Sequence, residues 1–226
     1  MNLPLTKDTK MQKIPKFPWP SGNSDSGEYK KCCEFLLDHL AEQDDSKWSQ
    51  ARQTLINRYA LPAQLIDKLH DTGDIYAIES DIVFVHRIAS TGNIAGASLQ
   101  SLSTACWKTI GDEHTAWFAT GDLSQARYVS AVVNPIEALS YHTIDPNETA
   151  ISYPSLAVSC PSLLALRELM LILQDNQGFT LAFCESKIGV AAEVVQRSSR
   201  YAPFIRRPAF SKSWNEKLQF LRTRTA

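Results

Sequence analysis

The sequence predicts an α/β protein, in which a parallel sheet flanked by helices follows a smaller α+β domain with an antiparallel meander. The chain has 226 residues, of which 44% are apolar and 21% charged, as in folded globular proteins. Apolar residues first recur at helical spacing, then in short β-like runs, and finally in strands that alternate with helices. Such alternation is typical of a parallel sheet. We therefore expect an arm over 1–27, an α+β domain over 28–121 and an α/β domain over 122–226.

The composition of the first 27 residues differs from the rest. Four prolines and a run rich in Ser, Gly and Asn give no periodic apolar face, which predicts a flexible arm. No segment resembles a signal peptide or an 18-residue membrane helix. The five cysteines are odd in number and lack paired spacing, which is typical of reduced thiols. We expect a cytoplasmic protein without disulfides or membrane contact.

Three helices are predicted before the meander, because apolar residues there recur every three or four positions. The first spans 28–43. Its apolar stripe consists of Tyr29, Cys32, Cys33, Leu36, Leu37 and Leu40. The second follows the capping residue Ser46 and runs to about Tyr59. The third begins at Pro62, which a first helical turn accepts, and ends at Gly73.

The strands and later helices follow from shorter patterns. Meander strands are predicted at 75–78, 82–87, 94–99 and 116–119, with Thr91-Gly92-Asn93 as one of the turns. Strands of the parallel sheet are predicted at 127–133, 156–159, 179–183 and 204–206. Helices are predicted at 135–142, 161–174, 188–199 and 214–221.

The net charge of −1 conceals an uneven distribution. Residues 187–226 carry nine basic and two acidic side chains, a net charge of +7, so the rest of the chain carries −8. A basic segment on an acidic body can bind a polyanion. A solvated basic surface without a ligand is the equally weighted alternative.

The segments that follow the parallel strands resemble a known family. VVNPIEALSY, LAFCESKIGVAAEVV and KSWNEKL resemble a Toprim-type domain, the fold shared by topoisomerases, bacterial primases and related nucleases. More narrowly, they are similar to Toprim-like domains of plasmid and mobile-element proteins. RYALPAQLIDKLHDTGDIYA, IVFVHR, GNIAGASLQ and AWFATG are similar to the uncharacterised domain that usually precedes them. The resemblance covers about residues 46–221.

The resemblance implies a metal site whose ligands this chain has replaced. In the family, a glutamate after the first strand is the general acid/base, and an Asp-x-Asp pair after the third holds Mg²⁺, which prefers carboxylates. The glutamate position is Val133, the Asp-x-Asp positions are Cys184 and Ser186, and the closing motif has Ser213 for aspartate. Neither valine nor neutral cysteine and serine replace anionic ligands. The resemblance thus implies the fold without the activity, and we expect no cofactor.

Two carboxylates near this edge, Glu137 and Glu185, form the alternative, a displaced Mg²⁺ site. Glu137 also has a structural interpretation, since Asn134 at N-cap, Pro135 at N1 and Glu137 at N3 form a start like a capping box. We favour the structural one. Glu185 is the middle residue of the former Asp-x-Asp and is expected to point away from its neighbours. Ser186 is interpreted as the N-cap of the helix from Ile188.

Cysteines at strand ends offer a further, weaker candidate. Cys184 and Cys160 can act as nucleophiles if a histidine such as His142 lies beside them. Buried cysteines usually behave as small hydrophobic residues, and we favour that interpretation.

Basic residues around the last strands are the candidates for phosphate contacts, which need no carboxylate. They are Lys187, Arg197, Arg200, Arg206, Arg207 and Lys212. Phe210 and Trp214 can stack on bases. For Trp214 we favour the alternative, that it attaches the last helix to the sheet.

These observations predict a non-catalytic nucleic-acid-binding or accessory protein of a bacterial mobile element, plasmid or phage-related system. It would act in DNA replication, transfer or defence, with DNA expected in preference to RNA. One alternative is a Mg²⁺-dependent nuclease or primase-type nucleotidyl transferase that uses Glu137 and Glu185. The other is a scaffold that binds a protein partner.

Overall fold

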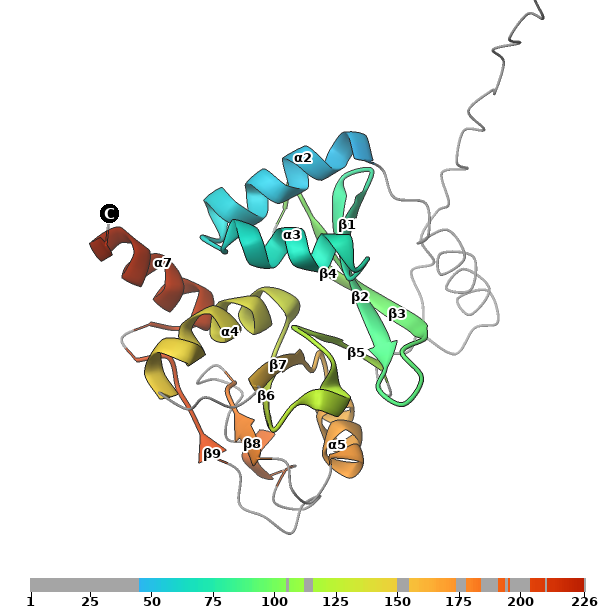
Figure 1. Cartoon of the computed structure of the whole chain (residues 1–226), viewed down its shortest axis with the longest axis vertical. Coiled ribbons are helices and arrows are strands. Elements are labelled where there is room, and N and C mark those ends of the chain that lie inside the picture. Colours follow the sequence, from blue (N-terminus) through green and yellow to red (C-terminus); the bar gives the residue numbers. More distant parts are fainter. Residues whose placement is uncertain are drawn as a thin grey trace, which may run out of the picture.

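The computed structural model describes residues 45–104, 106–111, 116–149, 155–173, 178–183, 191–193, 195, 204–209 and 211–225. The predicted arm 1–27, the predicted helix 28–43 and most of the predicted helix 188–199 lie outside these ranges. The elements described below are shown in Figure 1.

The first described segment is helical. Helix α2 (Asp45–Gln53) continues into a π-helical turn, η1 (Thr54–Arg58), where the sequence predicted one α-helix. Helix α3 (Ala63–Asp71) follows Pro62, which takes the N-cap position instead of the predicted first helical position. The helix ends as predicted at Gly73, whose φ of 70° is in the left-handed region that glycine adopts without strain.

The meander is antiparallel, as predicted. Strand β1 (Ile75–Ile78) pairs with β2 (Asp81–Ile88), which also pairs with β3 (Ile94–Ser101) and β5 (Ala116–Ala119). Strand β4 (Trp107–Gly111) pairs with β3 and was not predicted. It lies at the edge of the sheet and buries only Ile110, so its sequence has no alternating apolar pattern.

The described part of the second half contains four parallel strands in the order β7-β6-β8-β9. They are β6 (Tyr128–Val132), β7 (Ser155–Ser159), β8 (Gly178–Leu181) and β9 (Phe204–Ile205). Helices α4 (Pro135–Thr149), α5 (Leu163–Ile172) and α7 (Trp214–Thr225) accompany them. Both α4 and α7 extend beyond their predicted ends. In α4, Ile144 is buried on the face that packs inward, which extends the helix past His142.

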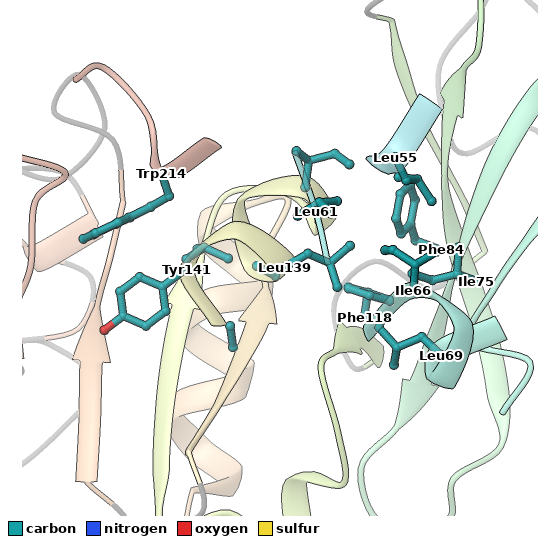
Figure 2. Packing of buried hydrophobic residues seen from close by; sticks show 14 of the residues in the cluster. Leu55, Leu61, Ile66, Leu69, Ile75, Phe84, Phe118, Leu139, Tyr141 and Trp214 are labelled. Carbon is teal, nitrogen blue, oxygen red and sulfur yellow. The ribbon is translucent and has the colours of Figure 1, made fainter. Parts of the chain in front are cut away.

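The two halves share one sheet and one core. Strand β5 pairs antiparallel with β7, with Phe118 opposite Ser159. The largest apolar cluster joins residues of α2 and α3 with residues of α4 and α7; Figure 2 shows ten of them labelled. Phe84 and Phe118 meet edge to face, with ring centroids 5.4 Å apart. A second cluster packs under α5. The sheet and core therefore continue across residue 122.

Among the described residues, no helix is long and apolar enough to cross a membrane.

Candidate nucleic-acid interface

The carboxyl ends of the parallel strands meet at one edge of the sheet, where the sequence placed the candidate site. Val133 follows β6 and is half-buried. Because this residue is valine, the position of the expected glutamate offers no side-chain oxygen as a ligand. Ser159 ends β7, and its buried hydroxyl has no hydrogen-bond partner within the described part of the chain. The positions of Cys184, Glu185 and Ser186 lie outside the described residues. The described ends of β6 and β7 thus carry no anionic side chain.

Glu137 is the acidic residue in the first turn of α4, the helix that follows β6. Its backbone N–H donates to the Asn134 side chain at 3.0 Å, which confirms the predicted N-cap of α4. The carboxylate does not reach back to complete a capping box. Instead, its oxygens accept hydrogen bonds from the backbone N–H groups of Trp214, at 2.7 Å, and Asn215, at 3.3 Å. Glu137 therefore caps the first turn of α7.

The environment of Glu137 opposes its ionisation. The residue is only 8% exposed, and burial raises the pKa of its carboxyl above the ordinary value, although the amides of Trp214 and Asn215 lower it in part. Because both oxygens already accept backbone hydrogen bonds, a metal ion would have to displace helix-capping contacts to reach them. This geometry favours the structural interpretation of Glu137.

Ser213 also has a structural place at the start of α7. Its hydroxyl accepts the N–H of Glu216 at 3.1 Å, and the Glu216 carboxylate accepts the N–H of Lys212 at 2.9 Å. This arrangement closely resembles a capping box, and the pattern Ser-x-x-Glu was visible in the sequence. Aspartate is an equally good N-cap, so serine preserves the capping role at this position of the closing motif.

Trp214 and Asn215 attach α7 to three other parts of the molecule. The Trp214 indole N–H donates to the Ala182 carbonyl, just after β8, at 2.8 Å. The Asn215 side-chain amide donates to the Tyr59 carbonyl at 2.7 Å and to the Ser140 hydroxyl at 2.9 Å. Trp214 is 1% exposed, so the idea that it stacks on bases is wrong, and its role in holding the last helix is confirmed.

The three described basic candidates differ in their surroundings. Arg206 is half-buried, donates to the Tyr141 hydroxyl at 2.8 Å and lies over the Tyr141 ring at 5.6 Å. Arg207 and Lys212 are exposed. Arg207 follows β9 and Lys212 precedes α7, so both lie near the carboxyl edge. The other candidates, Lys187, Arg197 and Arg200, lie outside the described residues.

An exposed aromatic residue that the sequence did not single out lies in the neighbouring edge strand of the sheet. Phe204, in the edge strand β9, is 72% exposed. The sequence identified it only as a strand residue, because its exposure depends on β9 being the last strand of the sheet. Phe210, the other predicted stacking residue, lies outside the described ranges.

Of the two thiol candidates, Cys184 lies outside the described residues, and Cys160 fails on burial. Cys160 is 1% exposed, and burial raises the pKa of its thiol well above the ordinary value, which opposes formation of the nucleophilic thiolate. The imidazole of His142 instead contacts the Thr120 hydroxyl at 3.3 Å. Within the described ranges, no group of three His, Cys, Asp or Glu side chains is placed to hold a metal ion.

A separate cleft of about 550 Å³ lies between the β2–β3 turn, β5 and the short 3-10 helix η2 (Leu123–Gln125). Its wall includes the ion pair of Arg87 and Asp74, with Nε and Oδ1 2.6 Å apart. Asp122 adds a second carboxylate. The charged lining residues therefore sum to −1, which disfavours phosphate, so this cleft is a poorer nucleic-acid site than the carboxyl edge.

No family model matches the chain. The chain is 26% identical over 132 residues to pXO2-78, an uncharacterised plasmid protein of Bacillus anthracis; the match covers 52% of this chain and 38% of the relative.

Solved structures give a more extensive likeness. The primase fragment of the bacteriophage T7 primase-helicase protein matches with a TM-score of 0.54 and 17% identity, covering 74% of this chain and 70% of that one. The RNA polymerase domain of Mycobacterium tuberculosis primase DnaG matches with a TM-score of 0.50 and 13% identity, covering 86% and 80%. The protein therefore has a mixed α/β fold that resembles Toprim-containing primase domains, which confirms the predicted fold class. At these identities the likeness concerns the fold alone.

Proposed function

We propose that the protein is a non-catalytic nucleic-acid-binding or accessory protein with a primase-related fold, which acts in the replication or transfer of a bacterial mobile element. The likeness to two primase domains supports the primase-related part of the proposal. The likeness to a plasmid protein supports the mobile-element part. Because the chain spans only 38% of that relative's length, the role of the longer protein is not transferred to this chain.

The observation that carries the proposal is the structural role of the Glu137 carboxylate. Its carboxylate caps α7 through the amides of Trp214 and Asn215, and the neighbouring strand end carries Val133. A Mg²⁺ site would need free anionic oxygens at this edge. The described part of this edge offers no such free anion and therefore repels phosphate less, which favours binding of a nucleic-acid backbone.

Exposed groups of suitable chemistry lie near this edge and on the neighbouring strand β9. Arg207 and Lys212 offer cationic side chains that can neutralise phosphates. Phe204 offers an aromatic face, and stacking on such faces stabilises single-stranded complexes by about 1–3 kcal/mol per base. Together they favour binding that depends on charge and stacking and needs no metal ion.

Charge reversal of the two exposed basic residues tests this interface. Fluorescence anisotropy would measure the binding of labelled single- and double-stranded DNA and RNA over a salt series. If each residue contacts one phosphate, Arg207→Glu combined with Lys212→Glu should weaken binding and make the log–log salt slope shallower by about 1.4–1.8. Phe204→Ala should weaken single-strand binding by about tenfold. Arg206 stays unchanged in this test because it bonds to Tyr141.

Lys68→Glu is the matched control, since Lys68 is an exposed basic residue on α3. It should change the affinity much less than the double variant does. Unchanged binding by the double variant would remove this edge from the interface. No binding of wild-type protein to any nucleic acid would instead favour the scaffold that binds a protein partner.

A further inference from the structure

Helix α5 presents an apolar face to solvent. Its inner face, Ala165, Leu166 and Leu169, is buried in the second cluster, away from α4 and α7, which pack in the largest one (Figure 1). Four of the nine large apolar side chains that are exposed in the described part of the chain lie on the rest of this helix. They are Leu163, Leu164, Leu171 and Ile172, which are between 38% and 58% exposed. Such a concentration of exposed apolar side chains marks an interaction surface.

The exposed side of α5 has the spacing of a surface that pairs with another helix. Leu164 and Leu171 are seven residues apart, so they lie on one line along the helix, about two turns or 10 Å from each other. Arg167 and Glu168 lie between them in the sequence. At about 100° per residue, Arg167 falls on one flank of the line and Glu168 on the other, each about 50° away. The surface is therefore an apolar line between a positive and a negative flank.

Both flanking charges can take part in an intermolecular contact. Arg167 is exposed and Glu168 is half-buried. Among the described residues neither of them forms an ion pair, since the two ion pairs there join Arg52 to Asp67 and Arg87 to Asp74. A partner of this helix must then offer an apolar line together with charges of both signs.

A second copy of the chain offers this combination. We propose that α5 is the contact surface of a homodimer, in which the α5 helices of two copies pack side by side and parallel about a two-fold axis. The apolar lines of the two copies then meet, with Leu164 opposite Leu164 and Leu171 opposite Leu171. The positive flank of each copy lies beside the negative flank of the other, so that each Arg167 meets a Glu168.

The charges also select the direction of the two helices. Antiparallel packing of the same surfaces would bring Arg167 beside Arg167 and Glu168 beside Glu168, and such like-charge contacts are unfavourable. The contact is small, because a standard interface uses about 20–30 residues on each side and α5 has ten. We therefore expect a weak dimer whose population rises with protein concentration. This assembly does not depend on nucleic-acid binding at the carboxyl edge.

Sedimentation velocity of the full-length chain tests the dimer. Between about 1 μM and 1 mM protein, the wild type should shift from monomer towards dimer. Leu164→Glu places two carboxylates opposite each other in the dimer and should raise the dissociation constant by about tenfold or more. Leu221→Glu on α7 is the matched control, since Leu221 is 40% exposed and Leu164 is 41% exposed, and it should dimerise as the wild type does. A wild type that stays monomeric throughout, or equal effects of the two variants, would overturn the proposal.

Exchange of the flanking charges tests the parallel arrangement. Arg167→Glu should weaken the dimer by about tenfold, and its combination with Glu168→Arg should restore the wild-type dissociation constant, because the two flanks then change sign together. Arg167→Glu without effect, or weakening that the second substitution does not reverse, would contradict the assigned pairing.

Disulfide formation gives an independent readout of the helix direction. Leu164→Cys and Leu171→Cys are made separately in a chain whose other cysteines, apart from the buried Cys160, are replaced by serine. Because a disulfide needs Cβ atoms within about 4.5 Å, oxidation of a mixture of the two variants should join position 164 to 164 and position 171 to 171. Mass spectrometry that finds position 164 joined to position 171 instead would overturn the parallel dimer.

Discussion

Removal of the Glu137 carboxylate is expected to destabilise the protein, although Glu137 lies near the carboxyl edge of the sheet, where the sequence placed the candidate site. In Glu137→Ala the backbone amides of Trp214 and Asn215 lose their acceptor. A buried amide left without a partner costs about 1–3 kcal/mol, with the shorter bond at 2.7 Å contributing more than the one at 3.3 Å. Relief of the cost of burying a carboxylate offsets part of this. We expect the free energy of unfolding to fall by about 2–3 kcal/mol.

The pH dependence gives a second readout of the same group. Burial raises the pKa of Glu137 in the folded protein above the ordinary value of 4.5. Its protonation therefore favours folding, and this contribution is fully present below about pH 4.5 and is lost as the pH rises through the folded-state pKa. Glu137→Gln cannot titrate, so its stability relative to wild type should increase as the pH rises through that window. Urea unfolding monitored by circular dichroism at several pH values measures both effects.

Glu216→Ala is the matched control at the same helix end. Its carboxylate accepts one hydrogen bond at an exposed position, so its loss should cost less than about 1 kcal/mol. If Glu137→Ala unfolds within about 0.5 kcal/mol of wild type, the capping role is refuted.

Three further predictions concern the scaffold. Gly111→Ala should destabilise strongly, because φ is 73° and the new Cβ would clash with the backbone carbonyl oxygen of Ala95. Gly92→Ala, at φ of 72° with open space around it, should cost only about 1 kcal/mol of unfolding free energy, and equal losses by thermal denaturation would contradict this. Asn215→Leu removes the amide that joins α7 to the N-terminal segment and should lower stability by about 2–4 kcal/mol in urea unfolding, and no loss would count against the described hydrogen bonds. Because one cluster spans both halves, calorimetry should show a single unfolding transition, and two separate transitions would be the opposing result.

The sequence predicted a structural element well where the residues that form it lie within a few positions of one another. The Asn134 cap and the end of α3 at Gly73 depend on residues within a few positions, and both are found. The edge strand β4 lacks an alternating pattern and was missed. The π-helical turn after α2 has no known sequence signature here, and one continuous helix was predicted instead.

The structure of the candidate site depends on contacts between residues that are far apart in the chain, and the sequence alone does not reveal these contacts. The partners of Glu137 lie 77 and 78 residues further along the chain, so the sequence predicted a cap on its own helix and missed the cap on α7. The exposure of Phe204 depends on strand order in the same way. By contrast, Ser213-x-x-Glu216 is a capping pattern that the sequence itself contains, whereas the family motif predicts only a missing aspartate at Ser213.

Binding of labelled single-stranded DNA by the wild-type protein, measured in EDTA and again in low Mg²⁺ with the products analysed, tests the central claim most directly. The account predicts similar affinity in both buffers, a steep loss of binding as salt rises from about 50 to 200 mM, and intact DNA without any newly made strand. Binding, cleavage or strand synthesis that appears only with Mg²⁺ would contradict it and would favour a metal-dependent enzyme.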